Sequence, residues 1–363
     1  MNESERSNPP SAGPRILIAG GGTGGHAIPA LCVADRLSER GATVEFVGSQ
    51  TGIERDLVPQ AGYSLHSLPL KGLAGGPIAR AQASALFVSA LLRCRTIIRN
   101  FHPGALLGVG GYASAPAVVV AKTLGIPTFL HEQNSIPGRV NRLAARLTKE
   151  VLVTFPAAVE HLKDAVWVGM PTRQEFFDTS REDALDRLNL EPPVVLIFGG
   201  SGGALKINLA AAKAFQTPTP YTVVQISGRR DFPRLSTNNE RHIILEYVED
   251  IWDYLAAAEV VVIRAGAGSL FDTAAVGRAA IVIPFPYATG DHQLHNARYF
   301  TEKGAAELLL NSEVSAESLR GRIEGLLDDD GRREELARRM STLATSGAAD
   351  EVARRLLDAA QKE

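Results

Sequence analysis

The sequence has 363 residues, of which 45% are hydrophobic and 21% charged, and a net charge of −2. This length exceeds what one hydrophobic core usually supports, so we expect two domains. Its two cysteines, Cys32 and Cys94, provide neither a disulfide framework nor the spacing of a metal site, which is typical of a reducing compartment.

Residues 1–14 are polar and contain prolines, so they predict a disordered tail and exclude a secretory signal. The longest strongly apolar stretches span about ten residues, against the roughly 20 needed to cross a bilayer. We therefore expect a soluble or peripheral protein.

The first half opens a parallel α/β sheet. Arg15–Ala19 predicts a strand that ends in glycines, Pro29–Arg40 a helix and Thr43–Val47 a second strand. Further strands are predicted at Ala105–Val109, Pro127–Leu130 and Val151–Thr154.

The second half repeats this opening, because Val194–Phe198 runs into GGSGG and Lys206–Phe215 predicts a helix. Later strands are predicted at Thr222–Ile226, Ile243–Leu245, Val260–Ile263 and Ala280–Pro284. We predict an α/β protein with two doubly wound, Rossmann-like domains that face a cleft.

The proline-containing, charge-rich segment after Val168 is the best candidate for a linker. The predicted organisation is a tail (1–14), an N-terminal domain (15–167), a linker region (168–191), a C-terminal domain (192–340) and a C-terminal helix that packs back toward the N-terminal domain (341–363).

Charge is distributed unevenly. The 75 residues from Leu57 to His131 contain six lysines or arginines and no acid, so the rest of the chain carries −8. This block includes the apolar run Ala83–Leu92, which three arginines follow. Such a helix alone is most often a core helix with a solvated basic end. The absence of acids over the whole block favours an anionic membrane surface instead.

The motif GGGTGGH, Gly20–His26, is the sharpest local signal. Its glycines let the backbone turn and point amides at a phosphate. It also fits the dinucleotide fingerprint G-x-G-x-x-G, but the second strand ends at Ser49 without the acid that holds the ribose, so we reject a dinucleotide enzyme. His26 is a candidate general base, and a role limited to hydrogen bonding is equally open.

A second glycine turn, Gly108–Ser114, also follows a strand, and the two turns together are suited to an acceptor pyrophosphate. His131–Asn134 follows another strand, where polar residues usually face the ligand. Asn134 is a candidate for binding a sugar hydroxyl. Glu132 also follows the strand, but taken alone it is better explained as a helix N-terminal charge.

In the second half, the turn Gly199–Ala204 with Ser201 is expected to bind donor phosphates, and Arg173 to pair with the diphosphate. Asp272 could accept both hydroxyls of a ribose, and Gln293 could hold a sugar. The sequence has no obvious Asp-x-Asp metal clamp, so we expect no metal and no cofactor.

Six ordered motifs, GGGTGGH, GVGGYASAPA, HEQNSIPGRVNR, GGSGGALKIN, RAGAGSLFD and PFPYATGDHQLHNA, resemble those of the bacterial lipid I N-acetylglucosaminyltransferases of peptidoglycan synthesis. The resemblance covers roughly residues 15–350. It implies a GT-B fold and inverting transfer of GlcNAc from UDP-GlcNAc to the C4 hydroxyl of MurNAc in lipid I, which makes lipid II. It also implies peripheral location on the cytoplasmic membrane face, a role in cell shape and division, cell-wall synthesis proteins as partners and no nucleic acid.

The resemblance places His26 and Asn134 in the catalytic region. It implies acceptor or pyrophosphate binding by Gly22, Thr23, Gly24, Gly25, Gly110, Gly111 and Tyr112. It implies donor binding by Thr23, Gly25, Asn134, Arg173, Ser201, Val248, Ala267, Ser269, Asp272 and Gln293.

Several donor-side positions depart from the family pattern, namely Met170, Asp272, Gly202, Leu205 and Gly268. Met170 stands where the family usually carries asparagine, and Asp272 where it carries glutamate. These departures leave three alternatives open: a glycosyltransferase with another donor or acceptor, an enzyme like UDP-GlcNAc 2-epimerase, and a non-catalytic relative.

Overall fold

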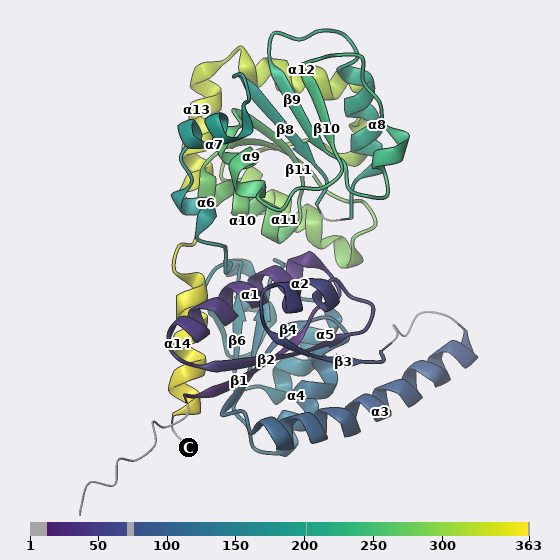
Figure 1. Cartoon of the computed structure of the whole chain (residues 1–363), viewed down its shortest axis with the longest axis vertical. Coiled ribbons are helices and arrows are strands. Elements are labelled where there is room, and N and C mark those ends of the chain that lie inside the picture. The colour runs from purple at the N-terminus through teal and green to yellow at the C-terminus, as the bar shows by residue number, and fades with distance from the viewer. Residues whose placement is uncertain (1–12, 71–75, 201, 362–363) are drawn as a thin grey trace, which may run out of the picture. The chain divides into compact units, whose positions relative to one another are not determined.

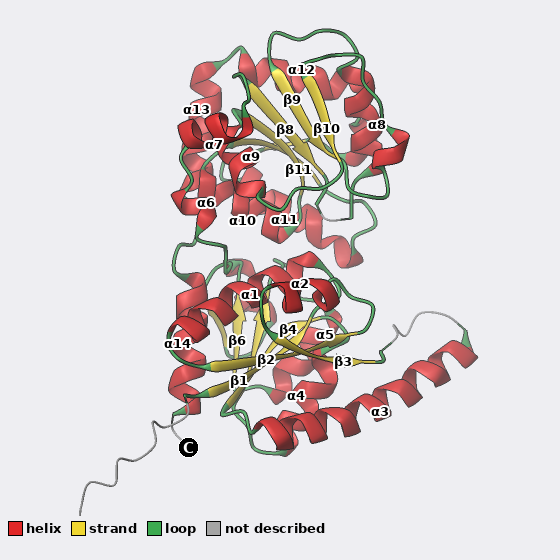
Figure 2. Cartoon of the chain, viewed as in Figure 1, coloured by secondary structure: helices red, strands yellow, loops and turns green. Residues whose placement is uncertain are grey.

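The computed structural model describes residues 13–70, 76–200 and 202–361, and it divides the chain into two compact units (Figure 1). Unit 1 comprises the described residues of 1–131, 140–151 and 350–363. Unit 2 comprises Glu132–Arg139 and Leu152–Ala349. The predicted α/β class is confirmed, since both sheets are built of strands alternating with helices (Figure 2).

The first sheet has seven strands in the order β3-β2-β1-β4-β5-β6-β7. The strands are β1 (Arg15–Gly20), β2 (Thr43–Ser49), β3 (Ser64–Leu68), β4 (Ala105–Gly110), β5 (Thr128–Glu132), β6 (Glu150–Val153) and β7 (Ala165–Trp167). The helices of this half are α1 (Gly24–Glu39), α2 (Glu54–Gln60), α3 (Pro77–Phe101), α4 (Ser114–Thr123) and α5 (Arg139–Ala144), with short 3₁₀ helices η1 (Ala145–Leu147) and η2 (Pro156–His161).

Helix α1 begins at Gly24, five residues before the predicted start at Pro29. The extended Thr23 is its N-cap, and the Thr23 carbonyl accepts the amides of His26 and Ala27. The end of the glycine motif therefore forms the first turn of the helix, and His26 lies within that turn.

Helix α3 follows the N-cap Gly76 and runs beside α4 (Figure 1). Among the described residues, one segment, Ala81–Phe101 of this helix, has the length and the hydropathy, 1.2, that a membrane span would need. Only 22% of its most apolar window is buried. Serines and arginines interrupt the apolar residues of this segment. The sequence therefore showed strongly apolar stretches of only about ten residues, although the whole segment is longer. By itself this composition is weak evidence of a span.

The second sheet has six strands in the order β10-β9-β8-β11-β12-β13, all paired in parallel. The strands are β8 (Val194–Phe198), β9 (Thr222–Ile226), β10 (His242–Leu245), β11 (Val260–Arg264), β12 (Ala279–Ile283) and β13 (Glu307–Leu308). The helices are α6 (Glu175–Asp178), α7 (Arg181–Leu188), α8 (Leu205–Ala214), α9 (Ile251–Ala257), α10 (Ala267–Val276), α11 (His292–Thr301), α12 (Ala316–Leu327) and α13 (Asp330–Ser341), with η3 (Phe232–Arg234), η4 (Thr289–Asp291) and η5 (Asn311–Glu313).

The continuous apolar strands of this sheet are explained by burial on both faces. Along β8, Val194, Leu196 and Phe198 belong to one core cluster, which Phe271 of α10 also joins. The alternate residues Val195 and Ile197 belong to a second cluster on the other face. The helices therefore cover two faces of one parallel sheet.

The segment 168–191 belongs to unit 2 and includes α6 and α7. Ser180 caps α7 by accepting the Asp183 amide, and Ala184 packs, fully buried, in a cluster with α9 residues. The predicted domain limits within this segment stay predictions.

Helix α14 (Ala348–Ala360) continues from unit 2 into unit 1 at Asp350. Within unit 1, Arg40 forms an ion pair with Asp350 at 2.7 Å, and Arg355 pairs with Glu150 at 2.7 Å. These pairs attach the C-terminal residues to α1 and β6.

Candidate active site

The first glycine turn leaves β1 through three residues with positive φ, Gly20, Gly21 and Gly22. The amide of Gly22 donates to Glu54 Oε2 at 2.6 Å. This amide is therefore already bonded within the protein, whereas we expected the turn to point its amides at a phosphate. A role of Gly22 in acceptor binding stays a prediction.

His26 lies on the same turn, half-buried, with Nδ1 2.9 Å from Thr23 Oγ1. Its ring lies against the second glycine turn, because a Cβ at Gly110 would come 3.0 Å from His26 Cδ2 and Nε2. A Cβ at Gly111 would overlap the carbonyl oxygen of Gly21. The two predicted glycine turns are thus packed together, and the absence of side chains makes room for the imidazole.

A cavity of about 180 Å³ lies beside these turns in unit 1. Its lining includes Gly21 and Gly22 and the exposed Tyr112 of the second turn. It also includes Ser49, the last residue of β2, and Thr51. The predicted acceptor residues Gly22 and Tyr112 therefore share one cavity.

The residue that sequence reasoning missed here is Glu54, the first residue of α2, which is only 1% exposed. Glu54 Oε1 accepts from the amide and the hydroxyl of Ser49 at 2.8 and 2.9 Å. We noted that no acid stands at the end of the second strand. An acid does reach that position from five residues further on, but it binds the backbone of the turn.

In unit 2, Glu132 is 1% exposed and organises the loop after β5, rather than providing a helix N-terminal charge. Its Oε1 accepts from the backbone amide of Asn134 at 2.9 Å, and its Oε2 accepts from the Gly138 amide at 3.0 Å. The loop HEQNSIPG is therefore tied around one carboxylate, which fixes where Asn134 lies.

Asn296 of α11, fully buried, is a second residue that we missed. Its Nδ2 donates to Asn134 Oδ1 at 3.2 Å and to the Ala265 carbonyl at 3.3 Å, while its Oδ1 accepts from Ser135. One amide thus joins the loop of Asn134 to the start of the RAGAGSLFD motif. Its place in the motif PFPYATGDHQLHNA was the available sequence signal, since its burial is visible only in the structure.

The third glycine turn follows β8, with Gly200 and Gly203 at positive φ. The carboxylate of Asp231, fully buried, lies close to Gly203 and accepts from Asn208 at 3.0 Å. Its partner Arg230 holds the pKa of Asp231 below its ordinary value. Ser201, the predicted phosphate ligand of this turn, lies outside the described residues.

Asp272 lies on α10 and is half-buried. Burial raises the pKa of its carboxyl to about 7, and the positive charge of Arg173 partly opposes this shift. The Arg173 guanidinium stacks over Trp252, 5.7 Å from the ring centre. These two predicted donor residues therefore interact electrostatically.

Three other predicted donor residues lie nearby in the chain. Ala267 and Ser269 are in the first turn of α10, and Val248, half-buried, packs against the core cluster that contains Phe271.

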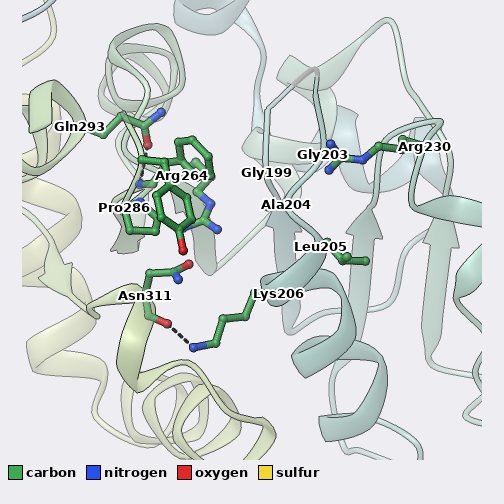
Figure 3. A pocket seen from close by; sticks show the side chains of 12 residues that line it. Gly199, Gly203, Ala204, Leu205, Lys206, Arg230, Arg264, Pro286, Gln293 and Asn311 are labelled. Carbon is green, nitrogen blue, oxygen red and sulfur yellow. Dashed lines mark hydrogen bonds between the residues drawn. The ribbon is translucent and has the colours of Figure 1, made fainter. Parts of the chain in front are cut away.

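A second cavity in unit 2, of about 350 Å³, contains Gln293, whose Oε1 accepts the amide of Phe285 at 2.9 Å (Figure 3). The other lining residues are Gly199, Gly203, Ala204, Leu205, Lys206, Arg230, Arg264, Phe285, Pro286, Tyr287 and Asn311. Arg264 is 7% exposed and donates to the Pro284 carbonyl at 3.0 Å. Burial lowers its pKa to about 10. With three cations and no acid in its lining, this cavity is suited to an anion, and Arg264 was not predicted.

The departures from the family pattern have distinct structural settings. Met170 is 1% exposed and packs in the core of unit 2. A Cβ at Gly202 or Gly268 would meet no atom within 4 Å, so larger side chains have room there. Leu205 begins α8 and lines the 350 Å³ cavity.

Within the described ranges there is no group of three or more His, Cys, Asp or Glu residues that could hold a metal ion.

Comparison with known proteins identifies the family. Residues 16–153 match the glycosyltransferase family 28 N-terminal domain, and residues 194–354 match the family 28 C-terminal domain. A protein of Rubrobacter xylanophilus, named UDP-N-acetylglucosamine–N-acetylmuramyl-(pentapeptide) pyrophosphoryl-undecaprenol N-acetylglucosamine transferase, is 65% identical over 91% of this chain and 99% of its own.

Solved structures agree with this assignment. The crystal structure of Acinetobacter baumannii MurG is similar with a TM-score of 0.74 and 27% identity, over 96% of this chain and 100% of that one. A putative UDP-N-acetylglucosamine 2-epimerase from Listeria monocytogenes has a TM-score of 0.71 over 97% and 98% of the two chains, but at 14% identity it shares the fold alone. The predicted GT-B fold is confirmed, and the chain belongs to glycosyltransferase family 28.

Proposed function

We propose that this glycosyltransferase transfers GlcNAc from UDP-GlcNAc to the C4 hydroxyl of MurNAc in lipid I, with inversion, and so makes lipid II. The observation that carries the proposal is the 65% identity, over nearly the whole of both chains, to the Rubrobacter xylanophilus transferase. The shared fold of the 2-epimerase, at 14% identity, gives no comparable support to the epimerase alternative.

In unit 1, His26 acts on the acceptor hydroxyl. When its Nδ1 carries the proton and donates to Thr23 Oγ1, Nε2 is the basic atom of the ring. Nε2 then takes the proton as the hydroxyl attacks the anomeric carbon of the donor. The second glycine turn supports this role, since Gly110 leaves space for the ring and keeps it in place.

Asn134 binds a hydroxyl of the sugar that is transferred. Its Oδ1 already accepts from Asn296, and its backbone is held by Glu132, so its side chain is pre-ordered before substrate binds. Gly22, Thr23, Gly24, Gly25, Gly110, Gly111 and Tyr112 line the acceptor side.

In unit 2, Asp272 accepts the ribose hydroxyls, and the third glycine turn with Ser201 and Arg173 binds the diphosphate. Val248, Ala267, Ser269 and Gln293 complete the donor residues of this unit. The resemblance also assigns donor binding to Thr23 and Gly25 of unit 1. Negative charge that develops on the leaving UDP is met by the positive charges of Arg173 and Arg264.

We further propose that the enzyme is peripheral on the cytoplasmic face of the cell membrane, where α3 contacts anionic lipid. Val88 and Leu92 of α3 are 57% and 66% exposed, and Arg93, Arg95 and Arg99 are exposed on the same helix. Apolar side chains next to cations, in a block of sequence without acids, favour an anionic surface.

The proposal is tested by incubating the purified protein with UDP-[¹⁴C]GlcNAc and a lipid I analogue, with and without EDTA. We expect label to enter the lipid fraction equally in both. If UDP-GlcNAc raises the melting temperature but no label moves, another acceptor replaces lipid I. If UDP-GlcNAc does not bind while another UDP-sugar does, the donor assignment is wrong.

A further inference from the structure

We propose that Glu54 is a positioning residue for the acceptor half of the reaction, because it holds the first glycine turn and through it the imidazole of His26. The inference deepens the proposed function and rests on it for the role of His26.

In the part of the chain that the structure describes, the hydrogen bonds to the Glu54 carboxylate come from Gly22 of the first glycine turn and from Ser49, the last residue of β2. Oε2 accepts from Gly22 at 2.6 Å, and Oε1 accepts from the amide and hydroxyl of Ser49. Among the described residues no lysine, arginine or histidine forms an ion pair with it, although it is only 1% exposed. Burying a carboxylate lowers the stability of the folded state. The presence of Glu54 is therefore better explained by the geometry that its hydrogen bonds impose on the glycine turn.

Three glycines from three segments make room for this carboxylate. A Cβ at Gly21 or Gly52 would overlap the Glu54 carboxylate, and a Cβ at Gly48 would lie 2.6 Å from Glu54 Cγ. Gly48 and Gly52 have no positive φ, so their backbone does not require glycine. The space for Glu54 therefore explains why these two positions lack side chains.

The path from Glu54 to His26 is short. Gly22, which donates to Glu54, precedes Thr23, and Thr23 Oγ1 lies 2.9 Å from His26 Nδ1. Thr23 is also the extended N-cap of α1. Releasing Gly22 therefore alters the hydrogen bond that orients the imidazole, while the rest of α1 stays packed in the core through residues such as Leu37, fully buried.

The first test replaces Glu54 with glutamine. Glu54→Gln keeps the shape but puts an NH₂ group against one of the two amides that the carboxylate accepts. We expect kcat to fall about tenfold or more and the KM for UDP-GlcNAc to stay within about twofold. The matched control is Glu45→Gln. Glu45, on β2, hydrogen-bonds His66 at 2.6 Å, and its carboxylate therefore lies against β3 rather than against the glycine turn. It should leave both constants within about twofold.

A second variant keeps the carboxylate and removes its space. In Gly52→Ala the new methyl group displaces the Glu54 side chain from its cradle, so the same loss of kcat is expected. Its control is Gly321→Ala on α12, where the added Cβ meets no atom within 4 Å. Gly52→Ala keeps the charge of Glu54 and changes only the position of its carboxylate. If both variants lower kcat to the same extent, the position of the Glu54 side chain is what the reaction requires.

A spectroscopic readout does not depend on transfer. In protein labelled with ¹⁵N-histidine, the His26 ring signals are assigned by their loss in His26→Gln. We expect them to shift in Glu54→Gln and Gly52→Ala and to stay in place in both controls. If wild-type protein transfers no GlcNAc yet these signals shift as expected, Glu54 still positions His26 and the proposed function fails.

The proposal is overturned if the His26 signals do not move, or if the folded fraction of Glu54→Gln retains wild-type kcat with only a lower melting temperature. It is also overturned if the KM for UDP-GlcNAc rises as much as kcat falls, because Glu54 would then act on the donor.

Discussion

Replacing Asp272 with asparagine should change how the stability of unit 2 depends on pH. Burial raises the pKa of the Asp272 carboxyl from 3.8 to about 7 in the folded protein. The folded state therefore holds its proton more tightly than the unfolded state between these values. The contribution of this carboxyl to stability is complete below about pH 4 and is lost as the pH rises toward 7.

The shift sets the size of the effect. Each pKa unit corresponds to about 1.4 kcal/mol, so the raised pKa disfavours folding by at most about 4 kcal/mol at pH 8. At pH 5, where the unfolded carboxyl is ionised but the folded one is still protonated, it disfavours folding by about 1.6 kcal/mol. Asparagine does not ionise. We expect Asp272→Asn to gain up to about 2.5 kcal/mol over wild type between pH 5 and pH 8.

Urea unfolding measured at both pH values tests this prediction. The only tryptophans, Trp167 and Trp252, both lie in unit 2, so their fluorescence follows that unit. Asp186→Asn, on the exposed face of α7, is the matched control and should show the wild-type pH dependence. Equal pH dependence in wild type and Asp272→Asn would refute the reasoning, because the carboxyl would then titrate normally.

Three further predictions follow from other parts of the molecule. His26→Ala should cut turnover at least about a hundredfold while UDP affinity, measured by calorimetry, stays near wild type; an equal loss of UDP affinity would place His26 on the donor side. Replacing Arg93, Arg95 and Arg99 with glutamate should weaken binding to anionic vesicles in sedimentation assays. If neither this change nor added salt alters vesicle binding, the proposal that α3 faces lipid is contradicted. Met170→Ala should lower the urea stability of unit 2 by about 2–5 kcal/mol, since Met170 is 1% exposed in its core; an unchanged midpoint would contradict that packing.

The order of elements could be predicted because local pattern and fold agree. Short β-branched runs such as Val194–Phe198 end in glycines and are followed by helices, and these strands form as expected. The start of α1 was predicted five residues too late, because the glycines and Pro29 disfavour a helix locally but are accommodated in this one.

The buried polar contacts could not be predicted from spacing. Glu54 lies 32 residues from Gly22, and Asn296 lies 162 residues from Asn134. Each is one of several polar residues in its helix, where a solvated position is the default expectation. Only the folded backbone shows that their side chains turn inward and tie functional loops together.

The most direct test of the proposed chemistry is the structure of the product. The disaccharide formed from UDP-GlcNAc and a lipid I analogue should be isolated and its linkage determined by NMR. Inverting transfer predicts a GlcNAc β-linked to C4 of MurNAc, because the donor sugar is α-linked to UDP. An α-linkage, attachment at another hydroxyl or free GlcNAc as the only product would contradict the account.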